Sequence, residues 1–222
     1  MKEIRDDTAQ RIVSAAGAVF AERGYRGTTI RQITMRAGVN VAAVNYYFKN
    51  KLELYTRVLR EAKRSAGQIA VQEIPGPPEQ QLRGFIERFV HHLLDPQRPA
   101  WHGRVIAMEM SNPTAALGVI VREITGPLFR DVRELVDKVV WNSASEAELD
   151  LLTLSIFGQC VFYACGRAVV EQLGTHLGQT ANRTERIAKH VYSFSMAGLK
   201  EFRRNAASTK TRAARPRQLT LS

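Results

Sequence analysis

Residues 28–51, TTIRQITMRAGVNVAAVNYYFKNK, carry the start and stop signals of two short helices that follow each other closely. Thr29, followed three residues later by Gln32, is a capping-box pattern, in which the two side chains satisfy free amides at a helix start. Gly38 predicts the end of that helix, because glycine enters the left-handed region at little cost. Asn40 can then cap a second helix, VAAVNYYF. The stretch therefore predicts a helix, a tight turn and another short helix.

Apolar residues in this stretch divide into an inner and an outer side. Ile33 and Ala37 lie four residues apart in the first helix, which is the spacing of a buried stripe. Val44 and Phe48 have the same spacing in the second helix and are expected to point inward. The expected outer face of the second helix carries no charge: Val41, Ala42, Ala43, Asn45 and Tyr46. This arrangement is typical of a helix-turn-helix, which lays its second helix in the major groove of DNA.

The stretch AERGYRGTTIRQITMRAGVNVAAVNYYFKNKLELY resembles the amino-terminal domain of TetR-type transcriptional regulators across roughly residues 8–60. The matching landmarks are Phe20, Gly24, Tyr25, Thr28, Thr29, Ile33, Ala37, Gly38, Val39, Tyr47, Phe48 and Lys51. This resemblance implies that five positions hold phosphates: Thr28, Thr29, Arg31, Tyr47 and Lys51. Lys51 also stands at a predicted helix start, where backbone amides favour an anion.

Base reading is expected from the second helix, through Asn40, Val41, Ala42, Ala43, Asn45 and Tyr46. Asparagine can bond bidentately to adenine, and the methyl groups of alanine and valine can contact a thymine methyl. Since this face carries no arginine, guanine contacts must come from Arg31, Arg36 or elsewhere. For Tyr46 and Tyr47 the alternative is structural, because one of the two rings is expected in the three-helix core.

Positive charge is concentrated at the two ends of the chain, which has a net charge of +11. Residues 1–64 hold 13 Lys/Arg and 6 Asp/Glu, and residues 203–222 hold 6 basic and no acidic residues. The segment between them holds 13 basic and 15 acidic residues. A basic amino-terminal domain suits a polyanion such as DNA. The basic tail is compatible with non-specific DNA association or with a solvated terminus.

Helical periodicity continues along the chain as far as about residue 204, so we expect an all-α fold. A first helix is expected over about 8–23 after a frayed arm, and a long connecting helix over 51–74. After the breaker Pro75-Gly76-Pro77-Pro78, further helical segments are expected over 79–94, 101–111, 114–141, 146–173 and 183–204. We predict a helix-turn-helix domain over 1–50, a helical effector-binding and dimerisation domain over 51–205, and a basic disordered tail over 206–222.

Within the second domain, RVIAMEMSNPTAAL with Trp101-His102 upstream looks like the carboxy-terminal domain of CecR-type regulators, over about residues 79–205. The TetR-type resemblance implies a homodimer formed through helices 146–173 and 183–204. The apolar stripes of these helices are too broad for two lone helices to cover, although they could pack within one subunit. Residues that could line an apolar effector site are Phe89, Trp101, Arg104, Met108, Phe129 and Phe157. For each of them, ordinary core packing is the alternative.

Several classes of protein are not favoured by the sequence. No run of about 18 apolar residues occurs and the amino terminus lacks an apolar signal core, so we expect a cytoplasmic protein without a membrane span. Cys160 and Cys165 lie in an apolar stretch and fit buried thiols. No phosphate-binding loop, nucleophile elbow or metal-ligand spacing occurs, so we expect no cofactor, no metal and no enzymatic activity.

We therefore expect a ligand-responsive transcriptional repressor that binds a palindromic double-stranded DNA operator as a dimer and is released by a small molecule. The alternatives are a sequence-tolerant architectural DNA-binding protein, and a helical enzyme or carrier. The sequence identifies neither the operator, the effector, the regulated genes nor the sign of regulation.

Overall fold

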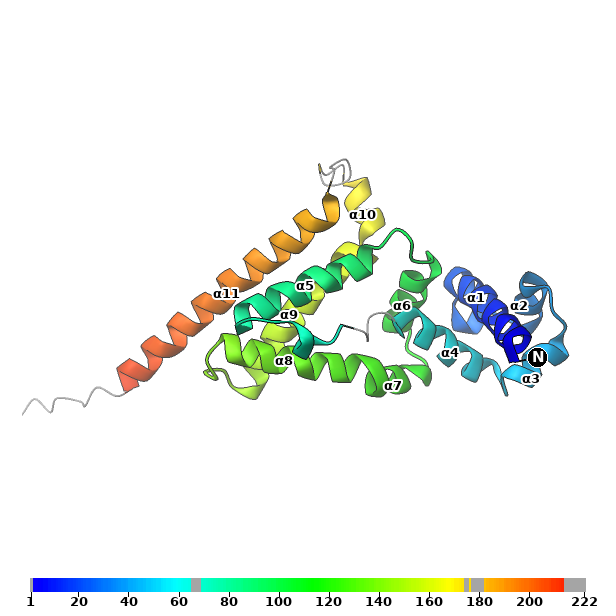
Figure 1. Ribbon diagram of the computed structural model, residues 1–222, viewed down its shortest axis with the longest axis horizontal. Coiled ribbons are helices and arrows are strands. Elements are labelled where there is room, and N and C mark those ends of the chain that lie inside the picture. Colours follow the sequence, from blue (N-terminus) through cyan, green and yellow to red (C-terminus); the bar gives the residue numbers. More distant parts are fainter. Residues whose placement is uncertain (1, 65–68, 174–175, 177–181, 214–222) are drawn as a thin grey trace, which may run out of the picture. The chain divides into compact units, whose positions relative to one another are not determined.

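In the computed structural model, residues 2–64, 69–173, 176 and 182–213 are described, and within these ranges the secondary structure is helical, with no strand (Figure 1). This confirms the predicted all-α class. The elements in chain order are α1 Lys2–Gly27, α2 Ile30–Ala37, α3 Val41–Tyr47, α4 Lys51–Arg64, the 3-10 helix η2 Val71–Glu73, α5 Pro78–Leu94, α6 Trp101–Ser111, α7 Ala116–Ile120, the π-helix η3 Val121–Thr125, α8 Gly126–Val139, α9 Glu146–Cys165, α10 Arg167–Gln172 and α11 Arg183–Ala213.

The chain packs as two compact units. The first combines residues 1–69 with 92–128, so α6 and α7 pack with the amino-terminal helices. The second combines residues 70–91 with those from 129 onward. The boundaries predicted at residues 50 and 205 divide the chain by expected function and not by packing. This functional division stays a prediction.

Helix α1 begins earlier than the sequence suggested. The arm expected before Thr8 is helical from Lys2 onward. Gly24 interrupts the helical backbone with φ 70° and ψ 171°, close to the predicted end.

Helices α2 and α3 form as the capping signals predict. The Thr29 hydroxyl accepts from the Gln32 amide, and the Gln32 side chain accepts from the Thr29 amide. Gly38 adopts the left-handed conformation with φ 63°, and the Asn40 side chain accepts from the Ala43 amide at 2.8 Å. Buried side chains join these two helices to α1 and α4: Ile12, Val19, Phe20, Ile33, Val44, Phe48, Leu54 and Val58.

Helix α4 is shorter than expected, which corrects the connecting helix placed over 51–74. It ends at Arg64, and after the undescribed residues 65–68 the chain has extended backbone at Ala70 and one 3-10 turn. Ile69 and Val71 are both buried. On a continuous α-helix they would lie about 200° apart, so a helix could not bury both on one face.

In the second unit, two helix boundaries also differ from expectation. The helix predicted over 146–173 is divided at Gly166, whose added Cβ would lie 2.7 Å from the Phe162 carbonyl oxygen. The helix predicted over 183–204 continues to Ala213, so residues 206–213 are helical rather than disordered. Alanine, lysine and arginine favour helix, and no glycine or proline occurs between Gly198 and Pro216. The tail from residue 214 lies outside the described residues.

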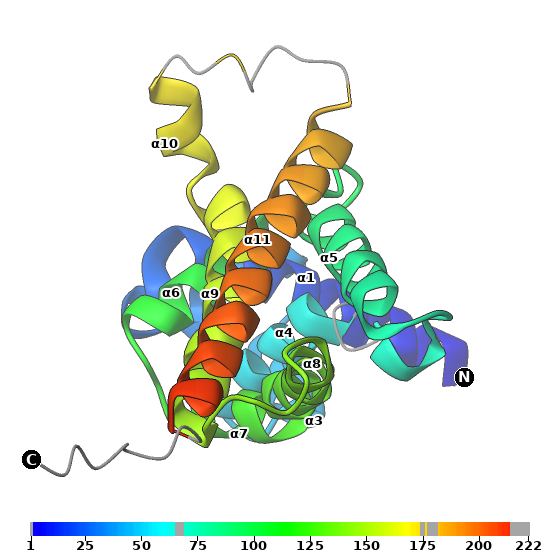
Figure 2. The same ribbon diagram turned by 90° about the vertical axis from the view of Figure 1, so that its left-hand side faces the viewer.

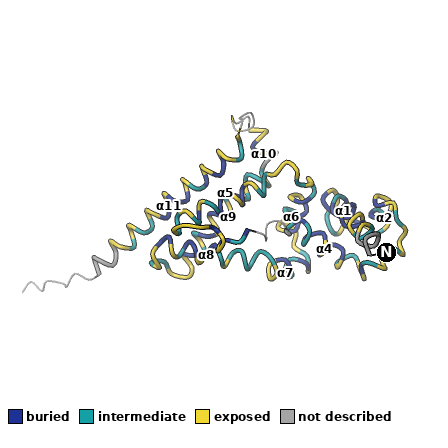
Figure 3. Tube along the Cα trace, viewed as in Figure 1, coloured by how far each residue is buried: buried dark blue, intermediate teal, exposed yellow. Residues whose placement is uncertain are grey.

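Helices α9 and α11 pack side by side (Figures 1 and 2). Leu149, Ile156, Cys160, Val191 and Leu199 are buried, and both helices alternate between buried and exposed turns (Figure 3). Cys160 is buried, as expected. Cys165, the last residue of α9, is exposed, so the expectation of a buried thiol was wrong there. By length and hydropathy α9 could cross a membrane, but a core helix of a globular protein passes the same test.

Candidate nucleic-acid interface

The exposed face of α3 carries the residues that sequence reasoning assigned to base reading. Val41, Ala42, Asn45 and Tyr46 are exposed, and Ala43 is partly exposed. Val44 is buried beneath them and fixes which side of the helix faces outward. Asn40 holds the helix start through its side-chain oxygen, so its side-chain amide nitrogen is the group left to donate to a base.

The two adjacent tyrosines differ in their surroundings. The Tyr46 side chain is 64% exposed, whereas Tyr47 is half-buried and packs against the core. Their rings meet edge to face with centroids 5.1 Å apart. Tyr47 is therefore the ring of the pair that packs in the three-helix core, as was predicted for one of the two. It supports Tyr46 on the outer face.

Two residues expected at phosphates have internal partners instead. Thr28 is buried and its hydroxyl donates to the Gly24 carbonyl at 2.7 Å. The Lys51 ammonium donates to the carbonyls of Tyr25 and Thr28, each at 2.9 Å, and lies 4.5 Å from the centre of the Tyr25 ring. Both residues thus join the turn before α2 to the start of α4.

The remaining positions expected at phosphates lie at the surface near the start of α2. Thr29 and Arg31 are exposed. In the capping box the Thr29 amide donates to Gln32 and the Thr29 hydroxyl oxygen accepts from the Gln32 amide, so the hydroxyl hydrogen is the group left to donate to a phosphate. Arg36 forms an ion pair with Glu22 at 2.6 Å, which leaves Arg31 as the better candidate for a guanine or phosphate contact.

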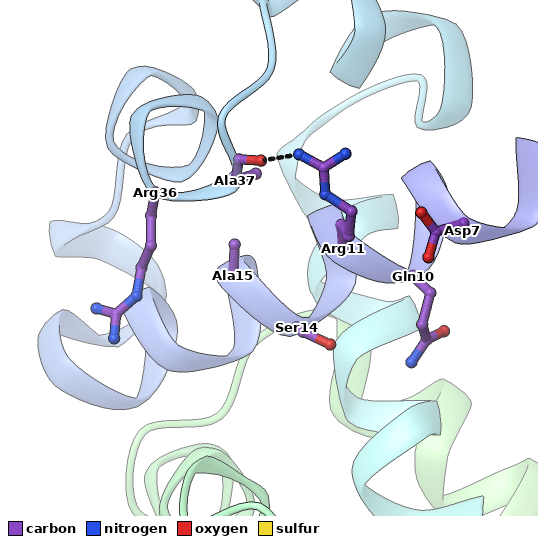
Figure 4. A pocket seen from close by; sticks show the side chains of 7 residues that line it. All are labelled: Asp7, Gln10, Arg11, Ser14, Ala15, Arg36 and Ala37. Carbon is purple, nitrogen blue, oxygen red and sulfur yellow. Dashed lines mark hydrogen bonds between the residues drawn. The ribbon is translucent and has the colours of Figure 1, made fainter. Parts of the chain in front are cut away.

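A shallow depression of about 360 Å³ lies where α1 meets the end of α2 (Figure 4). Its lining residues are Asp7, Gln10, Arg11, Ser14, Ala15, Arg36 and Ala37. Arg11 donates to the Ala37 carbonyl at 2.9 Å and so closes the end of α2. Both arginines of the depression already have protein partners, and the Arg11 contact holds the end of α2 next to the turn of the helix-turn-helix.

The residues expected to bind an effector fall into two groups. Phe89, Phe129 and Phe157 lie together in the second unit, with Phe157 5.5 Å from Phe89 and 6.2 Å from Phe129 between ring centres. Phe85 joins this aromatic cluster 5.7 Å from Phe157.

The other three effector candidates belong to the first unit. Arg104 is exposed and Met108 is partly buried. Trp101 packs on Gly17, where an added Cβ would lie 2.5 Å from the indole ring. This contact requires glycine at position 17 and shows that Trp101 helps to hold α6 against α1.

Two profiles of known families match this chain. Residues 12–58 match the bacterial regulatory proteins of the tetR family, and residues 78–199 match the carboxy-terminal domain of the HTH-type transcriptional dual regulator CecR. The chain belongs to the TetR family of transcriptional regulators. The second match covers more than half of the chain and points to the CecR branch of this family.

Individual relatives agree with this assignment. The CecR dual regulator of Shigella flexneri is 25% identical over 179 residues, which cover 74% of this chain and 79% of that protein. A TetR-like regulator from Rhodococcus sp. RHA1 has the same fold, with a TM-score of 0.66, 18% identity and coverage of 87% and 96% of the two chains. AibR, solved in complex with isovaleryl coenzyme A and operator DNA, has a TM-score of 0.64 at 14% identity, over 84% and 97%.

Sequence reasoning missed a buried polar contact between α4 and α6 of this TetR-family chain. The Tyr55 hydroxyl donates to Glu109 at 2.9 Å, and the same carboxylate accepts from the Thr114 amide at 2.8 Å. Burial, followed by the Glu109 carboxylate, raises the pKa of Tyr55 far above its usual value. Glu109 lies on the apolar side of its helix, and a charged residue there was the available signal.

A second missed cluster lies at the end of α4. Arg98 donates to the Ala62 carbonyl and, at 3.2 Å, to Nδ1 of His102. Burial, with Arg98 as the next cause, lowers the pKa values of His92 and His102 to about 4. Among the described residues no group of three or more His, Cys, Asp or Glu side chains could hold a metal.

Proposed function

We propose that this chain is a ligand-responsive repressor that binds a palindromic DNA operator as a homodimer in the cytoplasm and is released by a small molecule. The observation that carries the proposal is the face of α3, which is exposed, uncharged and capped by Asn40. Such a face can enter the major groove without placing an unpaired charge against a base edge.

Base reading falls to Asn40, Val41, Ala42, Ala43, Asn45 and Tyr46. Asn45 is the strongest candidate for a specific hydrogen bond, because it is exposed in the middle of the face and plays no part in the helix cap. The methyl groups of Val41 and Ala42 suit contacts with thymine methyls.

Affinity must come from groups around α3, because the helix itself carries no cation. We assign phosphate contacts to Arg31 and to the hydroxyl of Thr29. Three other residues position these groups and do not themselves contact DNA. Thr28 holds the turn before α2, Tyr47 supports the exposed Tyr46 ring, and Lys51 joins that turn to the start of α4. This division separates residues that touch DNA from those that position them.

Dimerisation is supported by the exposed faces of α9 and α11. Leu151, Leu154 and Phe162 on α9 and Phe194 on α11 are each more than half exposed. Exposed Gly158 and Gly198 lie on the same helices, and an added Cβ would have nothing within 4 Å at either. Contiguous apolar surface of this kind marks an interface, and glycine lets a second copy approach closely. The partner would then supply the second recognition helix.

Effector binding is supported by the cluster of Phe85, Phe89, Phe129 and Phe157. Aromatic side chains of this kind suit an apolar or amphipathic ligand. AibR, of the same fold, was solved in complex with both isovaleryl coenzyme A and operator DNA. A screen of candidate ligands by thermal shift, followed by operator release, tests this part, and Phe157→Ala should weaken the response to any hit.

The experiment for the main proposal is footprinting upstream of the chain's own coding region in the presence of excess random duplex. We expect a protected inverted repeat that survives the competitor. A reporter fused to that region then gives the sign of regulation, which matters because the relative CecR is a dual regulator.

The second candidate function is sequence-tolerant, architectural DNA binding, which is favoured by the six basic and no acidic residues over 203–222. In that case, an amount of random duplex equal in mass to the footprinted DNA should abolish all protection from cleavage. Absence of any footprint, with or without competitor, would contradict both DNA-binding functions.

A further inference from the structure

Three nitrogen-bearing side chains come together beside the end of α4, and all of them belong to the first unit. His92 lies near the end of α5, Arg98 in the loop that follows, and His102 in the first turn of α6. The Arg98 guanidinium donates to Nδ1 of His102 at 3.2 Å and to the Ala62 carbonyl. These two contacts fix the guanidinium between α4 and α6.

Arg98 lacks the carboxylate partner that a guanidinium removed from water normally has. Both of its hydrogen bonds within the described part of the chain go to neutral acceptors. Asp95 is exposed, and its Oδ1 accepts from the Gln97 amide at 2.9 Å. Burial lowers the pKa of Arg98 despite the opposing charge of Asp95. A partly desolvated cation without an anion beside it costs free energy.

His92 supplies a second group without a partner. Its Nε2 atom is buried and has no hydrogen-bond partner in the part of the chain that the structure describes. Buried side-chain nitrogens are hydrogen-bonded in the large majority of cases. His92 and Arg98 are each partly exposed as residues, so the cluster can be reached from solvent.

We propose that Arg98 and His92 bind a small oxyanion, such as a carboxylate or a phosphate group, with His102 holding the guanidinium in place. Guanidinium N–H groups match the spacing of the oxygens in these anions, and an imidazole can add a charge-assisted hydrogen bond. A divalent cation is the poorer ligand, because Arg98 repels it and Nδ1 of His102 already accepts a hydrogen bond.

Proton uptake should accompany binding, which distinguishes this site from a simple surface cation. Burial, followed by Arg98, lowers the pKa of His92 to about 4, and Asp95 opposes this change. A bound anion favours the protonated imidazole, so the pKa of His92 rises and a proton is taken up at pH 6. We assign the uptake to His92, because Nδ1 of His102 is engaged by Arg98.

Isothermal titration calorimetry of the full chain at pH 6 tests the site. Sodium sulfate and sodium acetate are the probes, and sodium chloride at equal ionic strength is the reference. We expect an oxyanion to bind where chloride does not, and the tighter probe distinguishes a phosphate-like ligand from a carboxylate. Titrations in two buffers of different ionisation enthalpy should show uptake of up to about one proton per chain.

Two pairs of variants assign the effect to its residues. His92→Gln keeps a polar side chain but cannot take up the proton, so the uptake should disappear and the dissociation constant should rise about 10-fold or more. His91→Gln, at the exposed neighbouring position, should retain both. Arg98→Gln should raise the dissociation constant about 10–100-fold, and Arg88→Gln, at an exposed position of α5, is its control.

Equal heats for chloride and both oxyanions would overturn the proposal. Unchanged proton uptake in His92→Gln, or equal losses in the control variants, would also overturn it. If loss of the Ala62 contact unfolds Arg98→Gln, which circular dichroism detects, the two histidine variants still decide the question. None of these titrations contains DNA, so their outcome is independent of the proposed function.

Discussion

Helix α3 in the first unit and helix α9 in the second both expose apolar side chains, but the two faces differ in composition. The face of α3 has small groups, one exposed amide and one tyrosine: Val41, Ala42, Asn45 and Tyr46. The face of α9 has large apolar groups with a glycine between them: Leu151, Leu154, Gly158 and Phe162.

This difference separates two kinds of partner. A face of methyl and amide groups can satisfy the hydrogen-bonding edges of base pairs. A face of leucine and phenylalanine offers no partner to a polar edge and is stabilised by removal from water. We therefore assign DNA binding to α3 and contact with a second copy of the chain to α9. A separate substitution tests each assignment.

The largest effect is expected from Leu154→Glu on α9. A carboxylate at a dimer interface loses its hydration without gaining a partner, so the dimer dissociation constant should rise more than about 100-fold. Analytical ultracentrifugation measures this, and operator affinity should fall with it. Lys138→Glu, at an exposed position of α8, is the control and should leave the dimer intact. A dimer that tolerates both changes would refute the role of this face.

For α3, Asn45→Ala should cost about 1–3 kcal/mol of binding free energy at the operator and leave random-duplex affinity unchanged. The reason is that an amide to a base edge carries sequence information, whereas phosphate contacts do not. Fluorescence anisotropy on both duplexes measures the two affinities. Equal operator binding by the variant would place base reading elsewhere than this face.

The position of α3 depends on Lys51, whose ammonium donates to two carbonyls. Lys51→Met keeps the length of the side chain but removes both hydrogen bonds, and we expect a loss of about 1–3 kcal/mol in the free energy of unfolding. Urea unfolding measures this loss. A variant of normal stability whose salt slope for DNA binding has become shallower would instead support the phosphate contact that the family resemblance implied.

Packing beneath the recognition unit is tested by Gly17→Ala. The added methyl would lie 2.5 Å from the Trp101 ring, so we expect a loss of about 1–3 kcal/mol of stability from overpacking. Gly103→Ala on α6, with nothing within 4 Å, should be neutral or stabilising by about 0.5–1 kcal/mol, because alanine favours helix. Thermal melts of the two variants that coincide would show that Trp101 does not pack as described.

The smallest effect concerns pH. Because burial and Arg98 lower the pKa of His102 to about 4, the folded chain resists a proton that the unfolded chain accepts near its ordinary value of 6.5. Stability from this group is therefore complete above pH 6.5 and is lost as the pH falls toward 4. His102→Gln should reduce the drop in melting temperature across this window. A drop of equal size in both chains would assign the pH dependence to other groups.

The two faces also differ in how far sequence could predict them. Around α3 the signals are local, and Thr29, Gly38 and Asn40 each act within four residues, so the helix boundaries followed from the sequence. The inward side of α3 was equally clear from Val44 and Phe48.

Tertiary contacts could not be predicted from local sequence signals of this kind. The internal partners of Lys51 and Thr28 join residues more than 20 positions apart or depend on the bend at Gly24. The break at Gly166 and the continuation of α11 to Ala213 depend on small differences in helix propensity, which do not fix a helix boundary from sequence alone. The effector set was divided because Trp101 packs with α1 whereas Phe157 packs with α5.

The central claim, that two copies of α3 read one DNA site, is tested most directly by selection from a random-duplex library followed by the stoichiometry of the selected complex. We predict an inverted repeat bound by two chains, with Leu154→Glu unable to select it. Selection of a single unrepeated sequence by one chain, or of no preferred sequence, would contradict this claim.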